Sequence, residues 1–422
     1  GFDTEDILLS GGTLSGFTMI DTDSYSALFT STDGIVATGQ VEVRADYTDS
    51  DGNGGSAGSH SVEIDTTNPV VTVKIEKTLL TDTDAGSMVT FQFSKAVSAF
   101  DETDVAVSSG TLGNFAMVDV RTYSATFTAT DGIETTGSLS VGTGYTDTVG
   151  NTGIGGTANL AIDRLNPTVT VQFEDALLTD SINSSVVTFE FSEGVAGFEE
   201  SDLSVTAGSI SDFTMIDARH FSATYTSAFL AGDDIETTGS VSIGSNYTDT
   251  AGNVGTGNSD TIAIDTLNPT VTVQFVESLL SDASSSSSVT FEFSSDVLGF
   301  IATDVTVSGG TLSGFTTIDG DSYSSTFTAA DGVERTGTVS VGTGYTNAAG
   351  NSGRSGSGTV LIDRLNPTVT VQIIKSSLSD ADTMSQVTFE FSEDVVGFDL
   401  ADVTVSHGTL SGFTSIDSSS FS

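Results

Sequence analysis

The sequence predicts an all-β protein made of tandem β-sandwich domains in an extended array, and three observations support this class. The hexapeptide Ile-Asp-x-x-Asn-Pro occurs four times and contains every proline of the 422-residue chain. Short segments that alternate apolar and polar residues recur between turn-forming residues, as in half-buried strands. No segment shows the spacing of apolar residues that an amphipathic helix requires.

The hexapeptide marks the boundaries between domains. Its prolines are Pro69, Pro167, Pro269 and Pro367, separated by 98, 102 and 98 residues. Proline restricts its own φ and the conformation of the residue before it, which suits a joint between units. A period near one hundred residues matches one β-sandwich domain. We therefore expect whole repeats at 66–163, 164–265 and 266–363, and partial repeats at 1–65 and 364–422.

The partial repeats are expected to lack strands. Residues 1–65 align with 99–163 and so lack the first two strands, whereas residues 364–422 lack the last ones. A half sandwich exposes unpaired edges and an apolar face. Either the chain is an excerpt of a longer polypeptide, or a second chain completes each half by strand addition. Both pieces contain the segment equivalent to 99–124, so joining them would duplicate it, and this favours the excerpt.

The repeat at 164–265 illustrates the expected elements. Alternation predicts strands, and clusters of Gly, Asp, Asn and Ser predict the turns and loops between them. No strand is assigned to residues 208–217, and residues 177–180 are expected to form a turn. The expected strands are 167–173, 187–191, 203–205, 221–225, 241–243 and 261–264, with loops at 197–202, 232–234 and 247–257.

About seven short strands per hundred residues favour an antiparallel immunoglobulin-like sandwich. A β-helix of nonapeptide repeats is the competing all-β fold, and the period near 98 residues argues against it. Alternation places one set of apolar side chains on the inward face of the second strand. This set is Val89, Phe91, Phe93, Val187, Phe189, Phe191, Val289, Phe291 and Phe293.

The composition limits the possible partners. There are 57 acidic and 11 basic residues, a formal net charge of −46. Nucleic acid and anionic membranes are improbable partners, because both need the opposite charge. Salt or bound cations must neutralise these carboxylates, and Ca²⁺ is the obvious cation where carboxylates recur at fixed positions. Without any cysteine there are no disulfides or thiolate metal sites, and no apolar run is long enough to span a membrane.

Strand directions predict that acidic groups of two domains meet at each joint. The loops at 197–202 and 247–257 should return to the upstream joint, and the turns at 177–180 and 232–234 should reach the downstream one. For the joint at Asp163, the upstream domain offers Asp82, Asp84 and Asp131. The downstream domain offers the acidic loop residues Glu199, Glu200 and Asp202, together with Asp249 and Asn253 of the later loop.

We expect Ca²⁺ at these joints, because it takes six to eight oxygen ligands, about the number that such groups supply. The same residues are also ordinary turn formers, and this alternative is favoured for Asp82 and Asp131 and for Asp21, Asp119, Asp217, Asp319 and Asp417. The candidate ligands are Asp65, Asn68, Asp104, Asp147, Asn151, Asp163, Asn166, Asp202, Asp249, Asn253, Asp265, Asn268, Asp304, Asn351, Asp363, Asn366 and Asp402.

Several motifs occur in the same order in the repeats. They are Val-Thr-Phe-Glu-Phe-Ser-Glu (187–193), Gly-Phe with Asp-Val-Thr-Val (397–398 and 402–405), Gly-Gly-Thr-Leu-Ser-Gly-Phe (309–315), Tyr-Thr-Asp-x-x-Gly-Asn (145–151) and the Ile-Asp joint. Over essentially the whole chain these motifs resemble the bacterial immunoglobulin-like repeats of giant surface adhesins, such as biofilm-associated proteins and repeats-in-toxin adhesins. The resemblance implies extended stalks on or outside bacterial cells, often rigidified by Ca²⁺ at the joints. The chain departs from the pattern in having Asn before each joint proline, where many relatives have alanine, and in Asn347, where Asp stands at 49, 147 and 249.

Nothing in the sequence favours catalysis. His60, His220 and His407 occupy different positions in their repeats, and no serine has a recognisable His and Asp arrangement. Three functional hypotheses remain. The chain is a stalk of an adhesin, or part of a filament, sheath or surface layer made of copies of itself, or a set of modules that bind cell-surface glycans. The first is favoured, because the copies differ mainly in loops of acidic or small residues.

Overall fold

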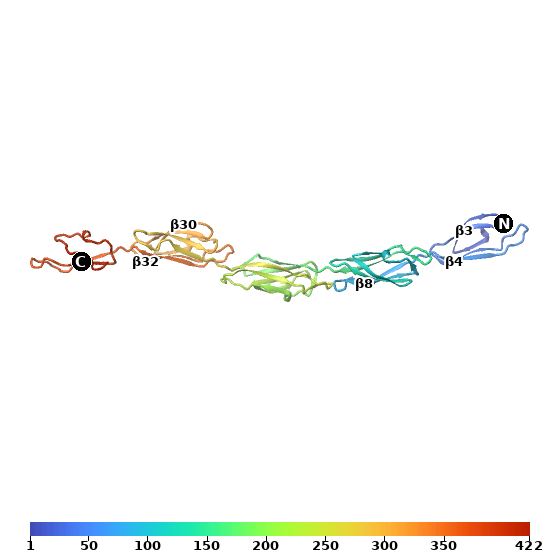
Figure 1. The fold of residues 1–422 in the computed structure, drawn as a ribbon, viewed down its shortest axis with the longest axis horizontal. Helices are drawn as coiled ribbons and strands as arrows, with labels where there is room; N and C mark the ends of the chain where they lie inside the picture. Colours follow the sequence, from blue (N-terminus) through green and yellow to red (C-terminus); the bar gives the residue numbers. More distant parts are fainter.

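The computed structural model describes residues 1–422 as five β-rich units that follow one another in an elongated row, with the termini at opposite ends (Figure 1). Each unit is joined to the next by one of the Asn-Pro hexapeptides. The only helical segments are five 3-10 turns of three residues each. None of them has the length and apolar character of a membrane-spanning helix.

The unit at 164–265 is a sandwich of two four-stranded sheets. Strand order is β16-β18-β22-β21 in one sheet and β17-β25-β23-β20 in the other. All neighbouring strands are antiparallel, except that β17 runs parallel to β25. This arrangement confirms the predicted immunoglobulin-like fold class. The elements are β16 (Val169–Phe173), β17 (Leu177–Thr179), β18 (Ser184–Phe191), β19 (Val195–Ala196), η3 (Glu200–Asp202), β20 (Leu203–Thr206), β21 (Gly208–Met215), β22 (His220–Ser227), β23 (Glu236–Ile243), β24 (Thr248–Asp249) and β25 (Asn258–Asp265).

Two segments differ from the sequence-based expectation. Residues 177–179, expected in a turn, form β17, because Leu178 and Thr179 are buried where the chain crosses to the second sheet. Residues 208–215, to which no strand was assigned, form β21 at the edge of the first sheet. A bulge between Ser211 and Thr214 interrupts its pairing with β22 and breaks the period-two pattern that would have revealed it.

The units at 66–163 and 266–363 repeat this topology. The first contains β6 (Val71–Ile75), β7 (Leu79–Leu80), β8 (Gly86–Phe93), β9 (Val97–Ser98), η2 (Glu102–Asp104), β10 (Val105–Ser108), β11 (Gly110–Asp119), β12 (Thr122–Ala129), β13 (Glu134–Val141), β14 (Thr146–Asp147) and β15 (Gly156–Asp163). The second contains β26 (Val271–Phe275), β27 (Leu279–Leu280), β28 (Ser286–Phe293), η4 (Ala302–Asp304), β29 (Val305–Ser308), β30 (Gly310–Thr317), β31 (Ser322–Ala329), β32 (Glu334–Val341) and β33 (Gly356–Asp363).

The two outer units contain fewer strands. Residues 1–65 form sheets of order β1-β4-β5 and β2-β3, and residues 364–422 form one sheet of order β34-β35-β36. The N-terminal elements are η1 (Thr4–Asp6), β1 (Ile7–Ser10), β2 (Gly12–Met19), β3 (Tyr25–Ser31), β4 (Val36–Val43) and β5 (Gly58–Asp65). The C-terminal elements are β34 (Val369–Ile373), β35 (Val387–Phe391), η5 (Leu400–Asp402) and β36 (Ser420–Phe421).

Each whole unit has its own apolar core between its two sheets. The nine residues expected on the inward face of the second strand are all buried, which confirms the predicted register. Aromatic rings pack edge to face around Phe198, whose centroid lies 5.0 Å from those of Phe191 and Phe221. Such contacts add to the free energy of burial.

Replacing Phe189 by Ala should lower the free energy of unfolding of its unit by roughly 3–5 kcal/mol, because a ring that is 1% exposed is lost from a packed core. Chemical denaturation of the full chain measures the change. Met215→Ala, at a side chain that is 58% exposed on β21, is the matched control and should have little effect. Equal effects of the two substitutions would contradict the assigned core.

Candidate cation centres at the joints

Loops from the two flanking domains meet at each joint, as the strand directions predicted. At the joint after Asp163, the backbone N–H of Asp82 donates to Asn253 Oδ1 of the next domain at 2.9 Å. At the following joint, the backbone N–H of Asp180 donates to Asn351 Oδ1 at 3.0 Å. Turns from the upstream domain therefore contact the loop 247–257, or its equivalent, of the downstream domain.

The loop after β23 has a compact local structure that explains its Asp-x-x-Gly-Asn motif. Asp249 Oδ1 accepts the backbone N–H groups of Ala251 at 2.8 Å and Asn253 at 2.9 Å. Gly252 has a φ of +92°, a left-handed conformation that favours glycine. Asp249 thus caps its own turn, as the turn-former interpretation requires, and its side chain is held in one orientation.

The same loop is bonded to the joint peptide. The buried Tyr247 hydroxyl lies 3.3 Å from the carbonyl oxygen of Pro167. Asn253, which is fully buried, donates through Nδ2 to the carbonyl oxygen of Asp163 at 2.9 Å and to Asp163 Oδ1 at 3.0 Å. Burial raises the pKa of Tyr247, and its hydroxyl also donates to the Thr256 carbonyl oxygen at 2.7 Å. These bonds place Asp249 beside Asp163.

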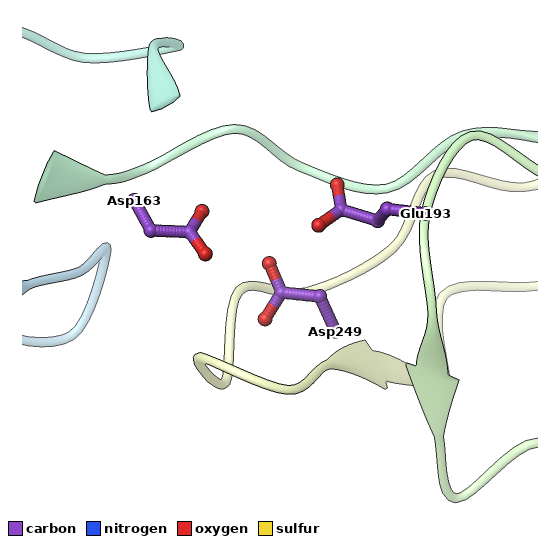
Figure 2. Close-up of side chains that lie close together, drawn as sticks. All are labelled: Asp163, Glu193 and Asp249. Atoms are coloured by element: carbon purple, nitrogen blue, oxygen red, sulfur yellow. The ribbon is translucent and has the colours of Figure 1, made fainter. Parts of the chain in front are cut away.

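Three carboxylates converge at this joint (Figure 2). Asp163 ends β15, Glu193 follows β18, and Asp249 lies in β24, and one oxygen of each lies within 4.8 Å of the others. No other group of three or more His, Cys, Asp or Glu side chains in the chain meets this criterion. Asp249 is 2% exposed, and Glu193 Oε1 is buried without a hydrogen-bond partner. An oxygen of this kind is what a bound cation would satisfy.

The electrostatics of the cluster are unfavourable without a cation. Burial, followed by repulsion from Asp249, raises the pKa of both Asp163 and Glu193. The charge of Arg219 opposes the rise at Glu193 but does not outweigh it. Arg164, the arginine of the joint peptide, points toward the upstream domain, where Nη2 lies 2.9 Å from Asp131 Oδ1 and Nε lies 3.5 Å from Asp82 Oδ1. Asp82 and Asp131 are therefore partners of an arginine, a role that the sequence analysis did not predict for them.

Sequence reasoning missed Glu193. The available signal was the position itself, because the corresponding residues are Lys95, Ser295 and Glu393, which differ in charge although the residue before each is always serine. Its proximity to Asp163 and Asp249 depends on how the two domains are joined.

The joint after Asp65 has the same two aspartates and a lysine in place of Glu193. Lys95 Nζ forms a salt bridge with Asp65, lies 3.0 Å from Asp147 Oδ2 and donates to the Thr67 carbonyl oxygen at 2.6 Å. Burial alone would lower the pKa of Lys95, but the hydrogen bonds to both aspartates outweigh it and raise this pKa. Hydrogen bonds, first those from Asn151 and then that from Lys95, overcome burial and lower the pKa of Asp147 to about 2.

The joint after Asp265 holds a single carboxylate of this set. Asn347 replaces the second aspartate, and its Nδ2 donates to the Leu267 carbonyl oxygen at 2.9 Å. Asn351 Nδ2 donates to Asp265 Oδ1 at 3.1 Å, and Ser295 stands at the position of Glu193. At the fourth joint, Asp363 and Glu393 are present, but residues 364–422 contain no counterpart of Asp249.

The remaining predicted ligands have other roles. Four of them cap the 3-10 turn in which they lie, because Oδ2 of each accepts the backbone N–H of the residue three positions earlier at 2.9–3.0 Å. They do not belong to the carboxylate cluster. These residues are Asp104, Asp202, Asp304 and Asp402. The amides of Asn151, Asn253 and Asn351 donate to the joint aspartates through Nδ2. They position the carboxylates, and the amide oxygens of Asn253 and Asn351 already accept the backbone N–H groups of Asp82 and Asp180.

The asparagines before the joint prolines also act as donors or are unbonded. Asn166 Nδ2 donates to the Val254 carbonyl oxygen at 2.8 Å, and Asn268 Nδ2 to the Ser352 carbonyl oxygen at 2.9 Å. Asn68 and Asn366 make no side-chain hydrogen bond. The turn-capping role expected of five other aspartates is confirmed, since each accepts the backbone N–H two residues later; they are Asp21, Asp119, Asp217, Asp319 and Asp417.

Comparison with solved structures finds only distant likenesses. Invasin, a bacterial integrin-binding protein, is 15% identical over 89% of this chain and 74% of its own, with a TM-score of 0.29. InvD of Yersinia pseudotuberculosis is 14% identical over 78% of this chain and 93% of its own, with a TM-score of 0.28. Cadherin domains 1–4 of protocadherin gamma B7 are 12% identical over 85% and 91%, with a TM-score of 0.30. Likenesses at this level carry no functional argument.

No curated protein sequence matches the chain. The family model of the bacterial Ig-like domain matches it five times in succession, over residues 1–64, 65–163, 163–264, 265–362 and 363–422. These matches cover the chain from end to end. The protein therefore belongs to the bacterial Ig-like domain family and consists of tandem domains of that family.

Proposed function

We propose that the chain is a non-catalytic stalk segment of a large bacterial extracellular adhesin, serving attachment to surfaces or biofilm formation, and that Ca²⁺ stiffens it at the joint around Asp163. The tandem bacterial Ig-like domains and their linear arrangement support the stalk (Figure 1). An end-to-end row of small domains is suited to spanning a distance rather than to catalysis.

The convergence of Asp163, Glu193 and Asp249 carries the calcium part of the proposal (Figure 2). Two domains contribute to the group, since Asp163 ends one and the other two belong to the next. Three carboxylates supply at least three of the roughly six to eight oxygens that Ca²⁺ binds, with backbone carbonyls and water as the remainder. The ion would supply the positive charge that holds them together and so fix the angle between the domains.

Calcium should stabilise the two domains that share this joint. At free Ca²⁺ ten times the dissociation constant, one site adds roughly 1.4 kcal/mol to the free energy of unfolding. The variant D163N/D249N should lose this gain, because two of the three charged ligands are gone. Calorimetric titration and thermal unfolding of the full chain, with and without chelator, measure both effects.

The matched control is D319N/D417N, which removes the same two charges from exposed turn-capping positions. It should retain calcium binding. If the wild-type chain takes up no calcium, or if both double variants lose it equally, the joint carboxylates act only as turn formers and local hydrogen-bond acceptors.

Calcium should also change the shape of the chain in solution. Removal of the ion leaves three mutually repelling carboxylates at the joint, so we expect a shorter mean end-to-end length with chelator. Small-angle scattering measures this length, and its forward intensity gives the mass of the particle. A monodisperse monomer at micromolar concentration supports a stalk, whereas a growing assembly would favour a filament or surface layer.

A further inference from the structure

The charge of the joints differs most at one position, and Asn347, in place of the aspartate at 147 and 249, is a second difference. The first of these positions lies two residues after the second strand of each domain and is occupied by Lys95, Glu193, Ser295 and Glu393. The joint aspartate is constant, at Asp65, Asp163, Asp265 and Asp363. The variable residue therefore sets whether the aspartates meet a positive, a negative or a neutral neighbour.

At the first joint the protein supplies its own cation. The Lys95 ammonium lies between Asp65 and Asp147 and also bonds the backbone of the joint at Thr67. Its three donors are used by groups from both sides of the joint. A metal ion would have to displace this ammonium, so the joint is closed without one.

At the second joint the same position has the opposite charge. Glu193 joins Asp163 and Asp249, the counterparts of the two aspartates that Lys95 bridges, and its buried Oε1 has no partner. The ammonium of the first joint shows that this place between the aspartates accommodates a positive group. The second joint has the same space between its two aspartates, but no positive side chain lies in it.

The third joint is closed by direct bonds between its domains. Asn268 Nδ2 donates to Asp180, the backbone N–H of Asp180 donates to Asn351 Oδ1 at 3.0 Å, and Arg354 forms a salt bridge with Asp234 across the joint. With Asn347 and Ser295 in place of two charged groups, only Asp265 carries a charge in this set. No cation is needed to balance it.

A second feature of the joint peptide alternates in step. The residue after the joint aspartate is Thr66, Arg164, Thr266 and Arg364. Both arginines bind two aspartates of the upstream domain, Arg364 through Asp282 at 3.0 Å and Asp331 at 3.1 Å. The joints with an arginine are those with a glutamate at the variable position, so the joints alternate between two kinds.

We propose that the residue at this variable position selects how each joint is closed, so that a calcium-dependent joint lies between two joints that need no metal. This inference rests on the proposed calcium site at Asp163. Lysine closes the joint after Asp65 internally, glutamate makes the joint after Asp163 depend on a divalent cation, and the joint after Asp265 is closed by hydrogen bonds and an ion pair. Removal of calcium then bends the array at the joint after Asp163 and leaves the joints on either side of it rigid.

The test exchanges the two charges in the full chain and measures each joint separately. The chain has no cysteine, so spin labels can be attached to cysteines introduced at matched exposed positions. The pair T38C/Q92C spans the first joint, and T136C/E190C, offset by 98 residues, spans the second. Electron-electron double resonance gives the distance distribution of each pair with Ca²⁺ and with chelator.

In the wild-type background, chelation should broaden the distribution of the second pair and leave the first unchanged. K95E should make the first joint sensitive to chelator and add one bound Ca²⁺ per chain in calorimetric titration. E193K should make the second joint insensitive and remove one. K74E on β6 and E174K directly after β16 make the same charge changes at exposed positions, and they should alter neither measurement.

The outcomes separate this inference from the proposed function. Suppose that the second joint binds calcium. If the first joint also responds to chelator, or if K95E gains no site, the inference is overturned and the stalk proposal still stands. No calcium binding by the wild-type chain overturns the calcium part of both. If K95E does not fold, E193K and the isosteric E193Q still test whether the residue at position 193 controls calcium binding, since both should lose one bound ion.

Discussion

The joints after Asp65, Asp163 and Asp265 depend on the hydrogen bonds that attach the downstream domain to the peptide that precedes it. In the central domain, Tyr247 lies in the apolar core and bonds the Pro167 carbonyl oxygen, while Asn253 bonds both the backbone and the side chain of Asp163. The same two bonds recur from Tyr145 and Asn151, and from Tyr345 and Asn351. A core tyrosine thus connects the packing of a domain to the geometry of its linker.

Because this scaffold is constant, a single side chain can change the chemistry of a joint without changing its shape. The two aspartates held by the scaffold are brought close together in a partly buried setting, where like charges repel. Lys95 removes that repulsion at one joint and Asn347 avoids it at another, whereas Glu193 increases it. Tandem copies of one fold can therefore differ in their response to cations while their cores stay alike.

Much of the architecture could be predicted from the sequence, because it depends on local patterns. The four Asn-Pro hexapeptides mark the joints, and alternation correctly placed Val187, Phe189 and Phe191 in the core. Strand β21 was not predicted because its bulge breaks the alternation, and strand β17 was not predicted because its few residues resemble a turn. Turn caps such as Asp217 were predictable, since their partners lie two residues away.

The sequence by itself determined the repeat length, the β-sandwich class, the inward faces of the strands and the abundance of carboxylates near the joints. Only the tertiary structure decided which carboxylates meet. Residues 163, 193 and 249 come together because two domains and three loops are held at one joint, and electrostatic repulsion depends on that distance rather than on separation along the chain. The structure likewise showed that Asp202 caps its own turn and that Asn253 acts as a donor, because a hydrogen-bonding side chain takes its role from the partner that the fold brings to it.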